Sequence, residues 1–256
     1  FHKKTNVLNY EDLKVWDANN KPLAASFQKI KKGKYYIQVD AKDAVYPITI
    51  DPINTTPNAQ LESNQVNARM GFSVSVAGDV NGDGYSDVVV GAHSYDNPEG
   101  DEGVAFVYHG SAIGISVSPT VILENNQVFA LFGLSVSTAG DVNGDGYSDV
   151  IVGSNYYSNV ETREGAFLVY HGSASGIVAT PVTFVESNQA QAQMGYSVAC
   201  AGDVNGDGYS DVVVGAWLYD NPEVNEGAAF VYYGGPAGIT ISGNSVLQAD
   251  QAGANY

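Results

Sequence analysis

The chain has one cysteine, few basic residues and no long apolar run. Its 256 residues include 11 Lys or Arg against 28 Asp or Glu, which gives a formal net charge of -17. A nucleic-acid-binding surface needs clustered positive charge to neutralise phosphates, so this composition argues against a nucleic-acid partner. One cysteine cannot form an internal disulfide or a thiolate zinc cluster. No stretch approaches the ~20 consecutive apolar residues of a membrane-spanning helix, so membrane insertion is not expected.

The few basic residues are concentrated near the N-terminus. Nine of the 11 lie within residues 1–42, whereas the rest of the chain carries 24 of the 28 acidic residues. The composition changes between residues 47 and 57, a stretch that contains three prolines. We therefore predict two domains, an N-terminal β segment at residues 1–52 and a second domain at residues 53–256.

The second domain contains an internal repeat. The decapeptide DVNGDGYSDV occurs three times, starting at Asp79, Asp141 and Asp203, and both intervals are 62 residues. A period that is kept without insertion or deletion indicates one structural unit copied in tandem. Residues 53–256 hold three periods and the start of a fourth.

Each repeat predicts four short strands. In the first repeat, residues 72–78 alternate between apolar and polar side chains, and residues 87–92 form the continuous apolar run typical of a strand buried on both faces. Residues 103–110 and 119–123 are further β-rich runs. Because no window shows a helical period, the predicted class is all-β. Four antiparallel strands at this spacing indicate β-propeller blades, three complete and a fourth begun.

The repeats also carry a family resemblance. Met70-Gly71, the acidic stretch at 79–87 and Gly91-Ala92-His93 resemble the FG-GAP repeat of integrin α-subunit propellers and of bacterial surface or secreted proteins. The resemblance covers residues 58–256 and implies a seven-bladed propeller, of which this chain would be a fragment. Otherwise, copies of the chain in an oligomer or filament would cover the open blade edges.

The N-terminal segment is also expected to be β-structured. Strand-like runs occupy residues 35–39 and 46–50. Residues 44–52 resemble the end of a β-sandwich that precedes FG-GAP propellers in some bacterial secreted proteins. At about 50 residues the segment is small for an independently stable domain, which favours the end of a larger sandwich.

The acidic stretch suits a calcium ion. Oxygen-bearing side chains occupy positions 1, 3, 5 and 9, and glycine at position 6 permits a sharp turn. Hard oxygen donors on a tight loop are what Ca²⁺ requires. The predicted ligands of three structural Ca²⁺ sites are the side chains of Asp79, Asn81, Asp83 and Asp87 with the Tyr85 carbonyl; those of Asp141, Asn143, Asp145 and Asp149 with the Tyr147 carbonyl; and those of Asp203, Asn205, Asp207 and Asp211 with the Tyr209 carbonyl.

Three alternatives compete with this calcium loop. An EF-hand needs a glutamate at position 12, where the repeats have Val90, Val152 and Val214. Magnesium fits less well because it prefers a smaller octahedral shell that keeps several waters. A metal-free Asp/Asn/Gly turn is the third alternative, but three carboxylates within nine residues repel one another without a cation.

The leading function is a calcium-stabilised module for adhesion or recognition. Exposed aromatic and acidic residues at 93–102, 155–164 and 217–226 suit a protein or carbohydrate ligand. Extracellular calcium modules bind with Kd of about 10⁻⁴–10⁻³ M, so we expect a location outside the cell. No catalytic constellation is present, and we expect no enzyme activity. A self-assembling filament or stalk protein and an accessory domain of a secreted hydrolase are the alternatives.

Overall fold

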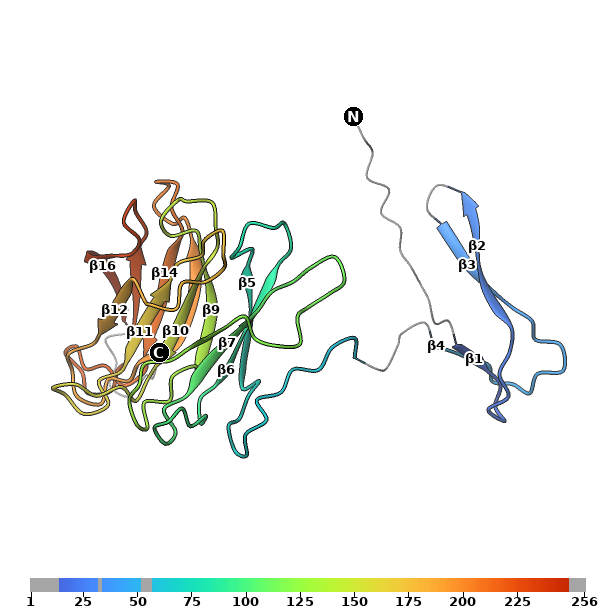
Figure 1. The fold of residues 1–256 in the computed structure, drawn as a ribbon, viewed down its shortest axis with the longest axis horizontal. Coiled ribbons are helices and arrows are strands. Elements are labelled where there is room, and N and C mark those ends of the chain that lie inside the picture. The colour runs from blue at the N-terminus through green and yellow to red at the C-terminus, as the bar shows by residue number, and fades with distance from the viewer. Residues whose placement is uncertain (1–13, 32–33, 52–56, 249–256) are drawn as a thin grey trace. The chain divides into compact units, whose positions relative to one another are not determined.

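A computed structural model describes residues 14–31, 34–51 and 57–248 (Figure 1). The chain divides into two compact units, the N-terminal unit Phe1–Asn58 and the C-terminal unit Ala59–Tyr256. The boundary predicted after residue 52 adjoins residues 52–56, which lie outside the described ranges, so it stays a prediction. Within those ranges the elements are strands and turns, and no helix able to cross a membrane is found.

The N-terminal unit contains two antiparallel strand pairs. β1 (Lys14–Trp16) pairs with β4 (Thr49–Asp51), and β2 (Ala25–Lys31) pairs with β3 (Lys34–Val39). The strand predicted at 35–39 is confirmed within β3. The strand predicted at 46–50 is wrong in its first half, because β4 begins only at Thr49. Pro47 has no backbone N–H to donate to a ladder, and the chain bends there instead.

The C-terminal unit consists of three four-stranded antiparallel sheets, one for each repeat, in which neighbouring strands are consecutive in sequence. The first blade is β5 (Ser73–Gly78), β6 (Asp87–Ala92), β7 (Val104–Tyr108) and β8 (Val121–Leu123); the second is β9 (Ser135–Gly140), β10 (Asp149–Ser154), β11 (Ala166–Tyr170) and β12 (Thr183–Glu186); the third is β13 (Met194–Gly202), β14 (Asp211–Ala216), β15 (Ala228–Tyr233) and β16 (Thr240–Gln248). The predicted all-β blades are confirmed. The start of a fourth blade lies outside the described residues.

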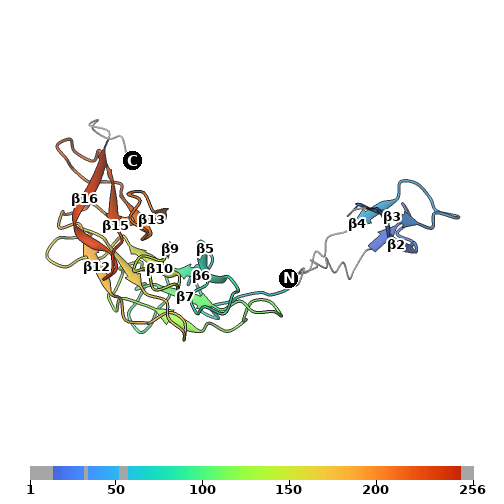
Figure 2. The same cartoon turned by 90° about the horizontal axis from the view of Figure 1, so that it is seen from above.

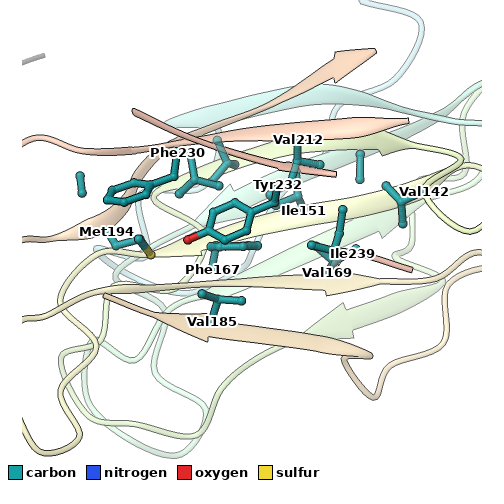
Figure 3. Packing of buried hydrophobic residues seen from close by; sticks show 14 of the residues in the cluster. Val142, Ile151, Phe167, Val169, Val185, Met194, Val212, Phe230, Tyr232 and Ile239 are labelled. Atoms are coloured by element: carbon teal, nitrogen blue, oxygen red, sulfur yellow. The ribbon is translucent and has the colours of Figure 1, made fainter. Parts of the chain in front are cut away.

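The core lies between blades, and the second blade contributes side chains to both of its faces. Along β10, Val150 and Val152 pack toward the first blade, whereas Ile151 packs toward the third. Figure 3 shows the cluster between the second and third blades, where the rings of Phe167 and Tyr232 have centroids 4.9 Å apart. Burial on both faces explains why Val150, Ile151 and Val152 form a continuous apolar run rather than an alternating pattern.

Among the first strands of the three blades, β9 packs against both β5 and β13 (Figure 2). Val136 and Val198 occupy the same repeat position in β9 and β13 and are 5% and 6% exposed. Their equivalent in β5, Val74, is 63% exposed because no blade of the described chain covers it. The apolar side of residues 72–78 is therefore an open face, which further repeats or another molecule could cover.

A pair of glycines at each junction between the described blades allows the blades to approach closely. A Cβ added at Gly91 would lie 1.9 Å from the carbonyl oxygen of Gly133, and one added at Gly153 would lie equally close to that of Gly195. The first member of each pair lies near the end of the second strand of one blade, and the other begins the next blade. Any side chain at Gly91 or Gly153 would enter the backbone of the adjacent blade, which explains glycine at these positions.

Candidate metal centre

The predicted ligands gather on three loops that join the first two strands of each blade. The acidic loops are residues 79–87 between β5 and β6, 141–149 between β9 and β10, and 203–211 between β13 and β14. Each loop lies at the same end of its blade. The structure therefore groups the predicted residues within each loop, in three copies.

The first aspartate of each loop holds the turn together. Asp79 Oδ1 accepts hydrogen bonds from the backbone N–H groups of Gly82 (2.7 Å) and Asp83 (3.1 Å), and Oδ2 accepts one from Gly84 (2.8 Å). The same three bonds recur at Asp141 and Asp203. Gly84 has φ +86°, a left-handed conformation that favours glycine at position 6.

Positions 3 and 5 make a second set of local bonds. Asn81 Oδ1 accepts from the N–H of Asp83 (3.0 Å), Asp83 Oδ1 accepts from that of Tyr85 (2.9 Å), and Asn81 Nδ2 donates to Asp83 Oδ2 (3.0 Å). The second and third loops repeat this pattern. Their oxygens lie on the exposed side of the loop, and each keeps a lone pair available for a further partner.

The aspartate at position 9 lies in a different environment. Asp87 is fully buried, and its two oxygens accept from the N–H groups of Val80 (2.9 Å) and Gly110 (2.8 Å). It thereby ties the acidic loop to the turn after β7. In the second blade, burial raises the pKa of Asp149 to about 7, although hydrogen bonds from Gly172 and Val142 act in the opposite direction. The structure gives position 9 a clamping role that was not predicted, and its role as a ligand stays a prediction.

The donor chemistry fits a hard divalent cation. The side-chain and carbonyl groups at positions 1, 3, 5, 7 and 9 offer oxygen, and the described residues include no Lys or Arg ion-paired with these carboxylates. A ligand shell is not already assembled, since no group of three His, Cys, Asp or Glu side chains in the described ranges is placed to hold a metal. Asp79 Oδ1 already accepts two backbone amides, whereas Asp79 Oδ2 and both oxygens of Asp87 accept one each and keep a second lone pair that a cation would share.

Sequence reasoning missed a set of buried glutamates that follows the same period. Glu102, Glu164 and Glu226 are 0, 1 and 0% exposed, and each precedes a glycine with positive φ. Glu164 Oε1 accepts from the N–H of Asn159 (2.7 Å), whereas no N–H of the described residues donates to Glu102, whose carboxyl group lies beside that of Glu99. The recurring Glu-Gly pair before the third strand was the available signal in the sequence.

Burial raises the pKa of Glu102 to about 8, and the carboxyl groups of Glu99, Glu124 and Asp96 add to the effect. Since the folded chain holds this proton more tightly than the unfolded chain, the free energy of unfolding falls as pH rises from the ordinary glutamate value to about 8. The Glu102→Gln variant is expected to lose this dependence. Urea unfolding at pH 8 should show a gain of roughly 1–3 kcal/mol over the parent chain, and little change at pH 4.

The matched control is Glu164→Gln. The carboxylate of Glu164 already accepts a backbone hydrogen bond, so neutralising it should bring no comparable gain at pH 8. Identical pH profiles for the parent chain and Glu102→Gln would contradict the expectation.

The loops predicted to bind a partner are anchored rather than free. Gln127 Nε2 donates to the Ser158 carbonyl (2.7 Å), and its Oε1 accepts from the Ser158 N–H (2.8 Å). Equivalent glutamines hold the loops of the first and third blades. Both ends of the first two loops and the last residue of the third are buried, contrary to their predicted exposure, whereas the central residues are exposed or half-buried. Exposed aromatic rings occur beside the first strands, at Phe72 and Tyr196.

Comparisons with known proteins agree with the repeat motif. A family described as FG-GAP repeat matches residues 70–108, and one described as FG-GAP-like repeat matches residues 141–214. Integrin alpha pat-2 of Caenorhabditis briggsae is 33% identical over 189 residues, which is 67% of this chain and 15% of that protein. Integrin alpha-6 of Gallus gallus is 33% identical over 156 residues, 60% of this chain and 14% of that protein. The chain thus spans about 15% of the length of such relatives.

Proposed function

This chain is an FG-GAP repeat protein similar to integrin α-subunits, and we propose that it serves as a calcium-stabilised β-propeller module for adhesion or recognition. The observation that carries the proposal is the acidic loop, which repeats the same oxygen donors and the same hydrogen bonds in all three blades. We expect the module to bind rather than to catalyse.

Charge supports a cation in each loop. The carboxylates at positions 1, 5 and 9 lie within nine residues, and no Lys or Arg of the described chain neutralises them. Two unit charges about 4 Å apart repel by roughly 4 kcal/mol at the effective dielectric of a protein surface. A divalent cation shared by the loop removes that repulsion and stabilises the link between the first two strands of the blade.

The expected calcium affinity supports a location outside the cytoplasm. Extracellular calcium modules have Kd values of about 10⁻⁴–10⁻³ M, which only the calcium concentration outside the cytoplasm can saturate. The similarity to integrin α-subunits supports a protein ligand, and a carbohydrate is the other class that aromatic surface side chains accept. Phe72 and Tyr196 supply such side chains at the end of the first strands opposite the acidic loops.

Isothermal titration calorimetry with CaCl₂ tests the proposal directly. We expect the parent chain to bind three equivalents, and the Asp83→Asn variant two, because asparagine keeps the bond to the Tyr85 N–H but removes one charge from the first loop. Asp87 is a poor choice for this experiment, since both of its oxygens hold backbone amides. Titration with MgCl₂ is the control. Absence of calcium binding by the parent chain would overturn the proposal.

A further inference from the structure

Each acidic loop that has a following blade is in contact with the loop of that blade through a tyrosine ring. A Cβ added at Gly82, position 4 of the first loop, would lie 2.7 Å from Cε1 of Tyr147, position 7 of the second loop. Gly144 and Tyr209 repeat the arrangement at the same 2.7 Å. Tyr85, the same position in the first loop, is 43% exposed because no described loop precedes it.

Backbone hydrogen bonds connect the same pairs of loops. The N–H of Ser148 donates to the carbonyl of Asp79 (3.0 Å), and the N–H of Ser210 donates to that of Asp141 (2.9 Å). The acceptors are the first residues of the loops, and the donors stand next to the tyrosines, at position 8. A second bond, from Ser173 N–H to the Val80 carbonyl (3.1 Å), adds the turn after β11 to the contact.

At each contact between neighbouring loops, the tyrosine therefore takes part in two proposed cation sites. The Tyr147 carbonyl is a proposed ligand of the second loop, while its ring lies over the middle of the first. A cation that orders the second loop would also fix the ring and the Ser148 N–H, both of which hold the first loop. When the first cation has already ordered these groups, the second cation binds at a lower cost in conformational entropy. Binding at neighbouring loops is then positively cooperative.

We propose that Tyr147 and Tyr209 are positioning residues that couple neighbouring cation sites, so that a filled loop raises the affinity of the loop in the preceding blade. The inference rests on the proposed calcium binding. Coupling between adjacent sites typically changes affinity about 5- to 150-fold, and because these loops share a ring and backbone bonds we expect at least about fivefold.

The test isolates single sites in the full 256-residue chain. With Asp145→Asn and Asp207→Asn present, the first loop is the remaining calcium site, and calorimetry measures its Kd. Restoring Asp145 should tighten binding at the first loop at least about fivefold. Adding Tyr147→Ala to the chain with Asp145 restored should abolish this gain at the first loop, whereas Tyr147→Phe keeps the ring and should preserve it.

A control separates positioning from general destabilisation. In a chain that keeps only the third loop, Tyr147→Ala should have no effect on calcium binding, because that ring contacts the first loop. If calcium binds but the Kd of the first loop is the same with Asp145 as with Asp145→Asn, coupling is overturned while the proposed function stands.

The comparison of chains with and without Asp145 does not depend on any tyrosine variant, so the inference stays testable if Tyr147→Ala fails to fold. Hydrogen exchange of the Gly82 and Asp83 amides supplies a readout besides affinity. Protection of these amides should rise when calcium fills the second loop of a chain whose first loop carries Asp83→Asn. Unchanged exchange would contradict coupling, and no calcium binding in any one-site chain would instead contradict the proposed function.

Discussion

The Gly153→Ala variant is expected to lose about 3 kcal/mol or more of its free energy of unfolding, a large effect for a single methyl group. The added Cβ would lie 1.9 Å from the carbonyl oxygen and 2.9 Å from the carbonyl carbon of Gly195. Both atoms belong to the backbone of the third blade, so neither can rotate away. The second and third blades would have to separate, which exposes the apolar cluster between them.

Thermal and urea unfolding measure this effect, and Tm should fall by roughly 6–12 °C or more in a unit of this size. Gly215→Ala is the matched control, since Gly215 has the same repeat position but the nearest atom to its added Cβ would be Ser197 Cβ at 3.6 Å, an ordinary contact. This substitution should change stability by no more than about 1 kcal/mol. If both variants lose the same free energy of unfolding, the contact between blades does not explain why residue 153 is glycine.

The period of the repeat made most of the C-terminal fold predictable. Residues 88–92 are apolar throughout because both faces of β6 and its copies are covered, and that property can be read from one repeat alone. The acidic loop was equally accessible, since its bonds connect residues two to seven positions apart. Because the same loop sequence recurs three times, few other structures could be predicted for it.

Contacts between blades could not be predicted in the same way. The Tyr147 ring over Gly82 joins residues in different repeats, and a period shows that units are copied without showing which surfaces meet. Glu102 was missed for a related reason. A glutamate in a polar loop is normally exposed to solvent, and only the packing of the folded blade shows that this one is buried. The exposed Val74 and buried Val136 have the same local sequence pattern and differ only in the neighbour that covers them.

Position 9 has a structural role that was not predicted. Asp87 was predicted as the ligand that closes the loop, and the structure places it where it joins the loop to the turn between β7 and β8. A buried carboxylate that accepts two amides is a rigid anchor for the remaining oxygens of the loop. Cation binding and folding of the blade are therefore expected to depend on each other.

Removal of calcium should consequently lower the thermal stability of the chain by a large amount. A ligand that binds only the folded state stabilises it by RT ln(1 + [L]/Kd), which is about 1.4–2.7 kcal/mol for each site at about 10 mM Ca²⁺ and a Kd of about 10⁻⁴–10⁻³ M. Three sites together contribute about 4–8 kcal/mol. Differential scanning calorimetry should therefore show a Tm that falls on the order of 10 °C or more when EGTA replaces calcium.

The control is a chain in which Asp83→Asn, Asp145→Asn and Asp207→Asn are combined. Each asparagine can still accept the hydrogen bond from position 7, but its amide nitrogen replaces the oxygen that accepts from position 3, so each loop loses one negative charge and one side-chain hydrogen bond. This variant should melt at the same temperature in calcium and in EGTA, because its loops no longer hold the ion. Its metal-free form should be about as stable as the metal-free parent, since the removal of one repelling charge from each loop offsets the lost hydrogen bond. A parent chain whose Tm is unaffected by EGTA would show that the loops are metal-free turns.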